Sequence, residues 1–121
     1  MDGGFHWSEI AWEKVNESID RKVVMGERLM MVMYRFSPNQ SWPEEAHEAE
    51  QSGYILKGRI ELSLSARGEK HLLGAGDGYL IPSRIPHSWI VLEETILIDF
   101  FSPPRRELYQ KKFAPNAKEG R

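Results

Sequence analysis

The sequence predicts an all-β domain, an antiparallel sandwich or a small barrel, that ends in one short helix. Short segments rich in β-branched, aromatic and other apolar residues follow one another at close spacing. Glycine and proline separate most of these segments, which is typical of small barrels and sandwiches. The clearest helix signal lies near the C-terminus, where Pro103-Pro104 precedes a charged segment.

Each predicted strand is an apolar segment between turn residues such as Gly26-Glu27, Gly58 and Glu93-Glu94. A polar hairpin tip is expected at residues 67–70. The predicted strands are residues 22–25, 28–36, 53–57, 60–65, 79–81, 87–92 and 95–101. A helix is expected over residues 105–113. Residues 114–121 are expected to form a flexible tail because they carry little apolar surface.

The composition predicts one domain and argues against several classes of function. A chain of 121 residues is long enough to bury a core as a single domain, 1–121. Cysteine is absent, so disulfides, thiolate metal sites and cysteine nucleophiles are excluded. The net charge of -2, with both signs scattered, argues against nucleic acid as a partner. The sequence shows neither a signal peptide nor a membrane-spanning run, which predicts a cytoplasmic protein.

The segment 28–36 is apolar on both of its faces. Its odd-numbered apolar residues, such as Met31, would face one way, and its even-numbered ones, such as Tyr34, would face the other. Such a strand is usually covered on both sides. A second sheet can cover one face, and either a partner subunit or the N-terminal segment with Trp7 and Trp12 can cover the other. A homodimer is therefore expected.

Four polar side chains would share a face with core residues if their segments are extended: Glu45, His47, Gln51 and, on a later strand, His87. Unpaired polar groups inside a barrel would be costly, and a bound metal would remove that cost. Alternatively, each histidine is a hydrogen-bonded core residue and Glu45 is a solvated loop residue. His6 and His71 lack such surroundings and are expected to be ordinary surface residues.

Two spaced motifs in this region resemble those of the cupin family. The first family motif has two histidines one residue apart, then Glu or Gln, then Gly, and the chain matches its last three members at His47, Gln51 and Gly58. The chain matches the second motif at Gly76, Pro82 and His87. The resemblance covers roughly residues 28–101. It implies a cupin fold, a double-stranded β-helix or jelly-roll barrel, with a short C-terminal helix.

The chain departs from the family pattern at three positions. Glu45 stands where the family has its first His, Arg84 where it has a Gly, and Val91 where it has a closing Asn. The resemblance implies a divalent metal ion bound by Glu45, His47, Gln51 and His87. Such a mixed nitrogen and oxygen set suits Zn, Fe, Mn or Ni without choosing among them. The departure at Glu45 leaves a weakened or lost metal site as an alternative.

The segment from Leu97 to Arg105 resembles the closing segment of the KdgF-like cupins of pectin and alginate degradation. That resemblance implies an enzyme that opens the ring of an unsaturated monomeric uronate, a small acidic sugar, to give a linear keto acid. It places Asp99, Phe101 and Arg105 at functional positions. Asp99 can move a proton, and Arg105 offers a planar fork for a carboxylate. Phe101, together with Trp89, can give the sugar a ring face to rest on.

Alternatives remain open from the residues alone. Asp99 can be a buried hydrogen-bonding residue, Phe101 a core residue and Arg105 a solvated helix residue. Two His and one carboxylate also suit a non-haem Fe(II) oxygenase. A non-catalytic module that binds a carbohydrate or another small molecule would keep the pocket without the chemistry.

Overall fold

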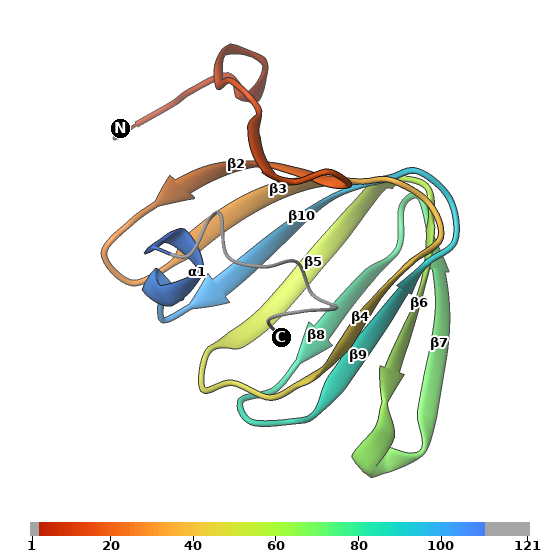
Figure 1. The fold of residues 1–121 in the computed structure, drawn as a ribbon. Coiled ribbons are helices and arrows are strands. Elements are labelled where there is room, and N and C mark those ends of the chain that lie inside the picture. The colour runs from red at the N-terminus through yellow and green to blue at the C-terminus, as the bar shows by residue number, and fades with distance from the viewer. Residues whose placement is uncertain (1–2, 111–121) are drawn as a thin grey trace.

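The computed structural model describes residues 3–110 and places ten strands in two antiparallel sheets that face each other as halves of a flattened barrel (Figure 1). The all-β prediction is confirmed. The strands are β1 (Glu13–Asn16), β2 (Ile19–Met25), β3 (Met30–Phe36), β4 (Gln40–Glu45), β5 (Glu50–Lys57), β6 (Arg59–Leu64), β7 (Glu69–Gly74), β8 (Gly78–Ile81), β9 (His87–Val91) and β10 (Thr95–Ser102). The short helical elements are η1 (Trp7–Glu9), η2 (Ser65–Arg67) and α1 (Arg106–Gln110).

The strand order brings distant segments together. One sheet has the order β1-β2-β3-β10-β5-β8, and the other has the order β4-β9-β6-β7. The chain therefore passes repeatedly from one sheet to the other. As a result β4 lies beside β9, in a register that places Glu45 opposite His87. Two polar residues far apart in the sequence thus become cross-strand neighbours.

Strand β10 shows how the sequence determines the inner face. Its residues alternate between buried and partly exposed, and Leu97, Asp99 and Phe101 all point inward. The strand lies between β3 and β5, where Asp99 pairs with Val32 on one side and Gly53 on the other. The inward carboxylate therefore sits well inside the larger sheet rather than at its edge.

Apolar side chains from both sheets fill the interior. The most buried include Met30, Val32, Ile55, Ile60 and Ile81, each 0–1% exposed. Burying an aliphatic side chain of this size contributes about 1.5–3 kcal/mol relative to leaving it in water. This core holds the polar residues of the inner face in a fixed frame.

Three strands were not expected from the sequence: β1, β4 and β7. Strand β4 is polar and contains Pro43, and its pairing with β9 shifts register between Trp42 and Glu45. The hairpin predicted after strand 60–65 is present, but its tip lies at residues 65–68 and not at 67–70, because strand β7 begins at Glu69. The turn comes earlier, through η2 and Gly68, whose φ of 66° is in the left-handed region.

Several predicted boundaries shift by two or three residues. Strands β2 and β5 begin at Ile19 and Glu50, three residues ahead of the predicted starts. The first three residues of each strand are mainly polar, so they gave no apolar signal. Helix α1 lies within the predicted range 105–113. Its predicted continuation beyond residue 110, like the predicted tail 114–121, lies outside the described residues. Between residues 3 and 110, no helix is long and apolar enough to cross a membrane.

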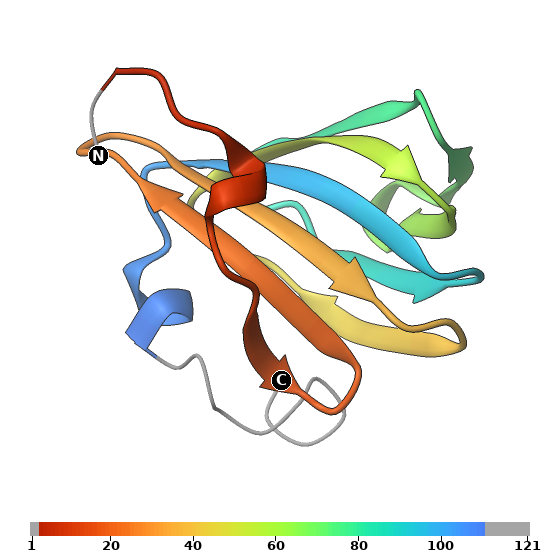
Figure 2. The ribbon, with the colours of Figure 1, turned by 90° about the horizontal axis from the view of Figure 1, so that it is seen from above.

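The N-terminal segment covers part of the outer face of the six-stranded sheet (Figure 2). The Trp12 ring centroid lies 4.2 Å from Cζ of Arg35 and 4.6 Å from Nζ of Lys22. Lys22 Nζ also donates a hydrogen bond to the Trp7 carbonyl oxygen over 2.8 Å. The N-terminal segment is therefore one of the two covers that were expected for the outer side of strand 28–36.

Candidate functional site

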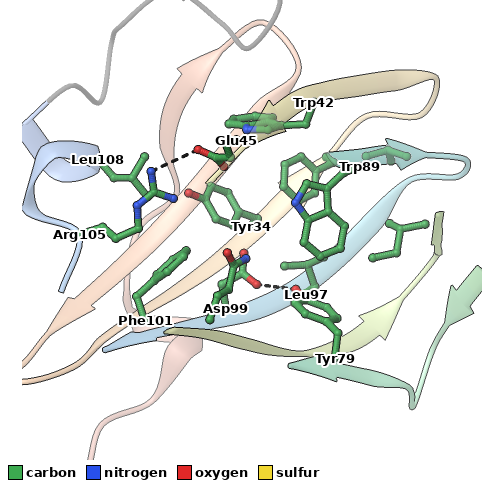
Figure 3. Close-up of a pocket in the computed structure, with 14 residues that line it drawn as sticks. Tyr34, Trp42, Glu45, Tyr79, Trp89, Leu97, Asp99, Phe101, Arg105 and Leu108 are labelled. Carbon is green, nitrogen blue, oxygen red and sulfur yellow. Dashed lines mark hydrogen bonds and ion pairs between the residues drawn. The ribbon is translucent and has the colours of Figure 1, made fainter. Parts of the chain in front are cut away.

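A cavity of about 550 Å³, its open mouth included, lies between the two sheets and beside α1 (Figure 3). Six residues singled out from the sequence line it: Glu45, Gln51, Trp89, Asp99, Phe101 and Arg105. The two remaining candidates lie next to it, with the His47 ring 6.0 Å from Phe101 and the His87 ring 6.3 Å from Trp89.

Glu45, His47 and His87 form a group that could hold a metal ion. Their ligand atoms all lie within 4.8 Å of one another. Glu45 and His87 come from the paired strands β4 and β9. His47 lies in the connection between β4 and β5, not in an extended segment as the sequence argument assumed. The convergence therefore depends on the turn after β4 and not on strand alternation alone.

Both imidazoles are oriented in the same way by the backbone. His47 Nδ1 lies 2.8 Å from the Ala49 carbonyl oxygen, and His87 Nδ1 lies 2.9 Å from the Ile85 carbonyl oxygen. A carbonyl only accepts, so we assign the ring hydrogen of each histidine to Nδ1. That tautomer leaves both Nε2 lone pairs free for a metal, the arrangement typical of metal-binding histidines.

His87 provides the test of whether a metal fits. Its side chain is 0% exposed, and among the described residues its Nε2 atom has no hydrogen-bond partner. The Glu45 carboxylate oxygen Oε2 lies 4.0 Å away. A buried polar atom without a partner is costly, and a cation near Nε2 would remove that cost. The residues therefore fit a divalent metal ion.

Gln51 connects the metal group to Asp99. Its Oε1 atom lies 3.1 Å from Nε2 of His47. With the ring hydrogen on Nδ1, both of these atoms present lone pairs, which favours a cation near them. The Gln51 side chain also hydrogen-bonds Asp99, and because a carboxylate only accepts, the Gln51 amide nitrogen is the donor. Gln51 can thus contribute an oxygen to the metal and a hydrogen bond to Asp99.

Asp99 is a buried carboxyl group held by two donors. Tyr79 donates its hydroxyl hydrogen to Oδ1 of Asp99, and Gln51 donates as described above. Burial raises the pKa of Asp99 to about 6, although both hydrogen bonds and the charge of Arg105 act in the opposite direction. A carboxyl group with a pKa near neutrality suits proton transfer in both directions.

Arg105 lies at the start of the C-terminal helix and closes one side of the cavity. Its Nη2 atom lies 3.4 Å from Oε1 of Glu45, and its Nε atom lies 2.9 Å from Oε2 of Glu107. Its guanidinium carbon lies 5.4 Å from the Phe101 ring centroid. Arg105 and Phe101 therefore form a cationic and aromatic wall, which suits an acidic sugar.

Sequence reasoning missed two tyrosines in the cavity, Tyr34 and Tyr79. The predicted parity of Tyr34 was right, but the residue was counted only as apolar. Tyr79 reaches Asp99 across Gly53, where an added Cβ would lie 2.2 Å from Cζ of Tyr79. A glycine inside a strand is a sign of such close approach, so Gly53 was the available signal.

Comparisons with known proteins identify the family of this chain. The family model of the cupin domain matches residues 32–101. The pectin degradation protein KdgF of Dickeya dadantii is 33% identical over 102 residues, which are 82% of this chain and 91% of that protein.

Solved structures of cupins are also similar to this chain. The structure of KdgF from Halomonas sp. matches with a TM-score of 0.79 and 32% identity, over 88% of this chain and 99% of that chain. An RmlC-like cupin from Shewanella frigidimarina matches with a TM-score of 0.80 and 24% identity, over 89% of this chain and 96% of that chain, and supports the fold alone. With the family model over residues 32–101, the 33% identical relative and the shared fold in agreement, this chain belongs to the cupin family.

Proposed function

We propose that this protein is a metal-dependent cupin that opens the ring of an unsaturated monomeric uronate. The observation that carries the proposal is one cavity that joins a buried acid-base group, Asp99, an arginine, Arg105, and the metal-capable group Glu45, His47 and His87. The likeness to proteins named KdgF, one of them a pectin degradation protein, supports the substrate class.

The reaction is an isomerisation that needs a base, an acid and a place for developing charge. A base removes the proton of the anomeric hydroxyl group, the anomeric carbon becomes a carbonyl, and its bond to the ring oxygen breaks. The ring oxygen keeps the bonding electrons and becomes an enolate oxygen on the carbon–carbon double bond. A proton added at the far carbon of that double bond then gives the linear keto acid.

The residues of the cavity can supply each of these roles. Asp99 takes the hydroxyl proton and returns it to carbon, for which a pKa of about 6 is suitable. Arg105 holds the sugar carboxylate through charge-assisted hydrogen bonds, and Phe101 and Trp89 support the ring. Glu45, His47, Gln51 and His87 would hold a divalent ion, which when bound would polarise sugar oxygens as a Lewis acid.

Turnover of an unsaturated monouronate by two variants tests these roles. We expect Asp99→Asn to lower kcat by about 100- to 10,000-fold, because it removes the proton-transfer group. We expect Arg105→Ala to raise KM by about 10- to 100-fold, because it removes a charge-assisted contact. The reaction can be followed by the loss of ultraviolet absorbance as the conjugated double bond is consumed.

Arg106→Ala is the matched control for Arg105, because Arg106 is the next residue and is exposed. It should keep wild-type kinetics. Wild-type turnover in both Asp99→Asn and Arg105→Ala, with folding intact, would contradict the assigned roles. A wild-type protein that binds monouronate and never converts it would instead favour a non-catalytic binding cupin.

One observation favours a second candidate function. Glu45, His47 and His87 make a set of two imidazoles and one carboxylate, which non-haem Fe(II) oxygenases use. The amide oxygen of Gln51 beside His47 would add a fourth protein ligand and leave less room for oxygen chemistry. Oxygen uptake that depends on both Fe(II) and a substrate would support this second function and oppose the first.

A further inference from the structure

Tyr34 places an unused hydrogen-bond donor in the cavity. The residue lies on β3 and lines the cavity, and its side chain is 7% exposed. Within residues 3–110 its hydroxyl group makes no hydrogen bond, whereas the hydroxyl of Tyr79 is committed to Asp99. Because Tyr34 lines the open cavity, a bound molecule can accept a hydrogen bond from this hydroxyl group. Tyr34 therefore has the features of a residue that contacts a bound molecule.

The surroundings of Tyr34 place its hydroxyl among the charged groups of the site. The charges of Asp99, Arg105 and Glu45 all act on its ionisation. In Figure 3 the hydroxyl is turned toward Arg105 and Glu45. The ring is held in that direction by Phe36, on which it stacks with a centroid distance of 5.1 Å and an interplanar angle of 24°.

The covalent structure of a uronate places the carboxylate that Arg105 would bind close to the ring oxygen that Tyr34 would contact. In an unsaturated uronate the carboxylate carbon and the ring oxygen are both bonded to the same carbon, which is one end of the double bond. A sugar whose carboxylate lies on Arg105 therefore has its ring oxygen close to the same side of the cavity. Tyr34 presents its hydroxyl on that side, while the Asp99 carboxylate is held by Tyr79 and Gln51.

We propose that Tyr34 is a further catalytic residue, which donates a hydrogen bond to the ring oxygen as that oxygen becomes the enolate. This role rests on the proposed ring-opening function. As the bond to the anomeric carbon breaks, its electron pair goes to the ring oxygen, where Tyr34 stabilises the new charge. Asp99 carries the hydroxyl proton to carbon, so Tyr34 gains and loses no proton over the cycle. A donor aimed at developing charge typically contributes about 100- to 1,000-fold in rate.

The ionisation of Tyr34 agrees with a role as a donor. Burial, together with the charge of Asp99, raises its pKa to about 12, although Arg21 and Arg105 act in the opposite direction. The hydroxyl group therefore keeps its hydrogen at neutral pH. A residue in that state can donate a hydrogen bond, but it does not serve as a base.

Kinetics of Tyr34→Phe in the metal-loaded protein test the proposal. The substitution removes one oxygen atom and keeps the ring that stacks on Phe36. We expect kcat and kcat/KM to fall together, by about 100-fold or more, with KM nearly unchanged, because the interaction forms only in the transition state. Thermal stability and metal content should stay at the wild-type level, since the hydroxyl has no partner to lose. Tyr54→Phe is the matched control, because Tyr54 is 49% exposed on the outer face.

The possible outcomes separate this inference from the proposed function. If wild type and Tyr54→Phe are active, Asp99→Asn is inactive and Tyr34→Phe keeps wild-type kcat, the role of Tyr34 is wrong and the ring-opening function stands. If Tyr34→Phe raises KM alone, the hydroxyl contributes to ground-state binding and the catalytic role is overturned. If wild type converts no unsaturated monouronate at all, both the proposed function and the role of Tyr34 fail together.

Discussion

The burial of His87 is costly for folding but places a free ring nitrogen where a metal could bind. Its ring is fully buried and fixed by the Ile85 carbonyl oxygen, and its Nε2 atom is left without a hydrogen-bond partner among the described residues. A core histidine retained for packing would normally have both nitrogens satisfied. The hydrogen-bonded core alternative considered from the sequence therefore explains only one side of the ring.

Metal content provides the test at this position. We expect protein purified without chelator to carry a divalent metal, and His87→Ala to lose it. The loss of affinity should exceed the roughly 10- to 100-fold that follows loss of an outer partner of a ligand. His71→Ala is the matched control, because His71 is exposed and its Nε2 atom pairs with Glu69 at 3.1 Å. Metal retained in His87→Ala, or absent from wild type even after metal is added, would contradict the site.

Gly53 is the second position where one residue decides the site. It has no side chain, and this allows Tyr79 to cross β5 and reach Asp99. We expect Gly53→Ala to lower the free energy of unfolding by about 1–3 kcal/mol, because the added methyl group displaces the Tyr79 ring. Urea denaturation would measure the change. Gly4→Ala is the control, since no atom lies within 4 Å of its added Cβ. Equal stability of both variants would show that Tyr79 moves freely.

At the scale of elements, the turn between β8 and β9 links the two motifs. Arg84, at a position where the family has glycine, has a φ of 65° in the left-handed region. Its backbone N–H donates to the His47 carbonyl oxygen over 2.7 Å. The turn thus joins the segment that carries His47 to the segment that leads into His87. Its unusual conformation is part of how the two histidines are brought together.

Substitution of Arg84 tests the strain in this turn. A non-glycine residue in the left-handed region costs about 1–2 kcal/mol, and glycine recovers that cost minus about 0.4–1 kcal/mol of unfolded-state entropy. We expect Arg84→Gly to raise the free energy of unfolding by about 0.5–1 kcal/mol. Arg84→Ala keeps the strain and should leave stability near wild type. Chemical denaturation distinguishes them, and a less stable Arg84→Gly would show that the arginine side chain itself contributes.

At the scale of the whole molecule, the outer face of the six-stranded sheet is only partly covered. The N-terminal segment packs near Lys22 and Arg35, on β2 and β3. Farther along the sheet, Tyr54 on β5 and Leu80 on β8 are 49% and 61% exposed. The homodimer expected from the sequence remains a prediction, and this exposed part is the surface on which we expect a second copy to pack.

Light scattering after size-exclusion chromatography would test the dimer. We expect wild type to have twice the mass of one 14.0 kDa chain, and Leu80→Lys to have the mass of a single chain, because burying a charge in an apolar interface is costly. Leu72→Lys is the matched control, since Leu72 is 59% exposed on the other sheet. A monomeric wild type would contradict the prediction, as would dissociation by Leu72→Lys alone.

The sequence by itself determined the fold class and the inward face of most strands. These follow from local rules, since alternation assigns a side to each residue and glycine and proline mark the turns. Strand β4 and the position of His47 in a loop were not predictable in this way, because their segments are polar and irregular. The tertiary structure decided which atoms meet: Glu45 opposite His87, Tyr79 across Gly53, and the free hydroxyl of Tyr34 in the cavity. Those contacts depend on the pairing register between segments far apart in the chain, which no local pattern records.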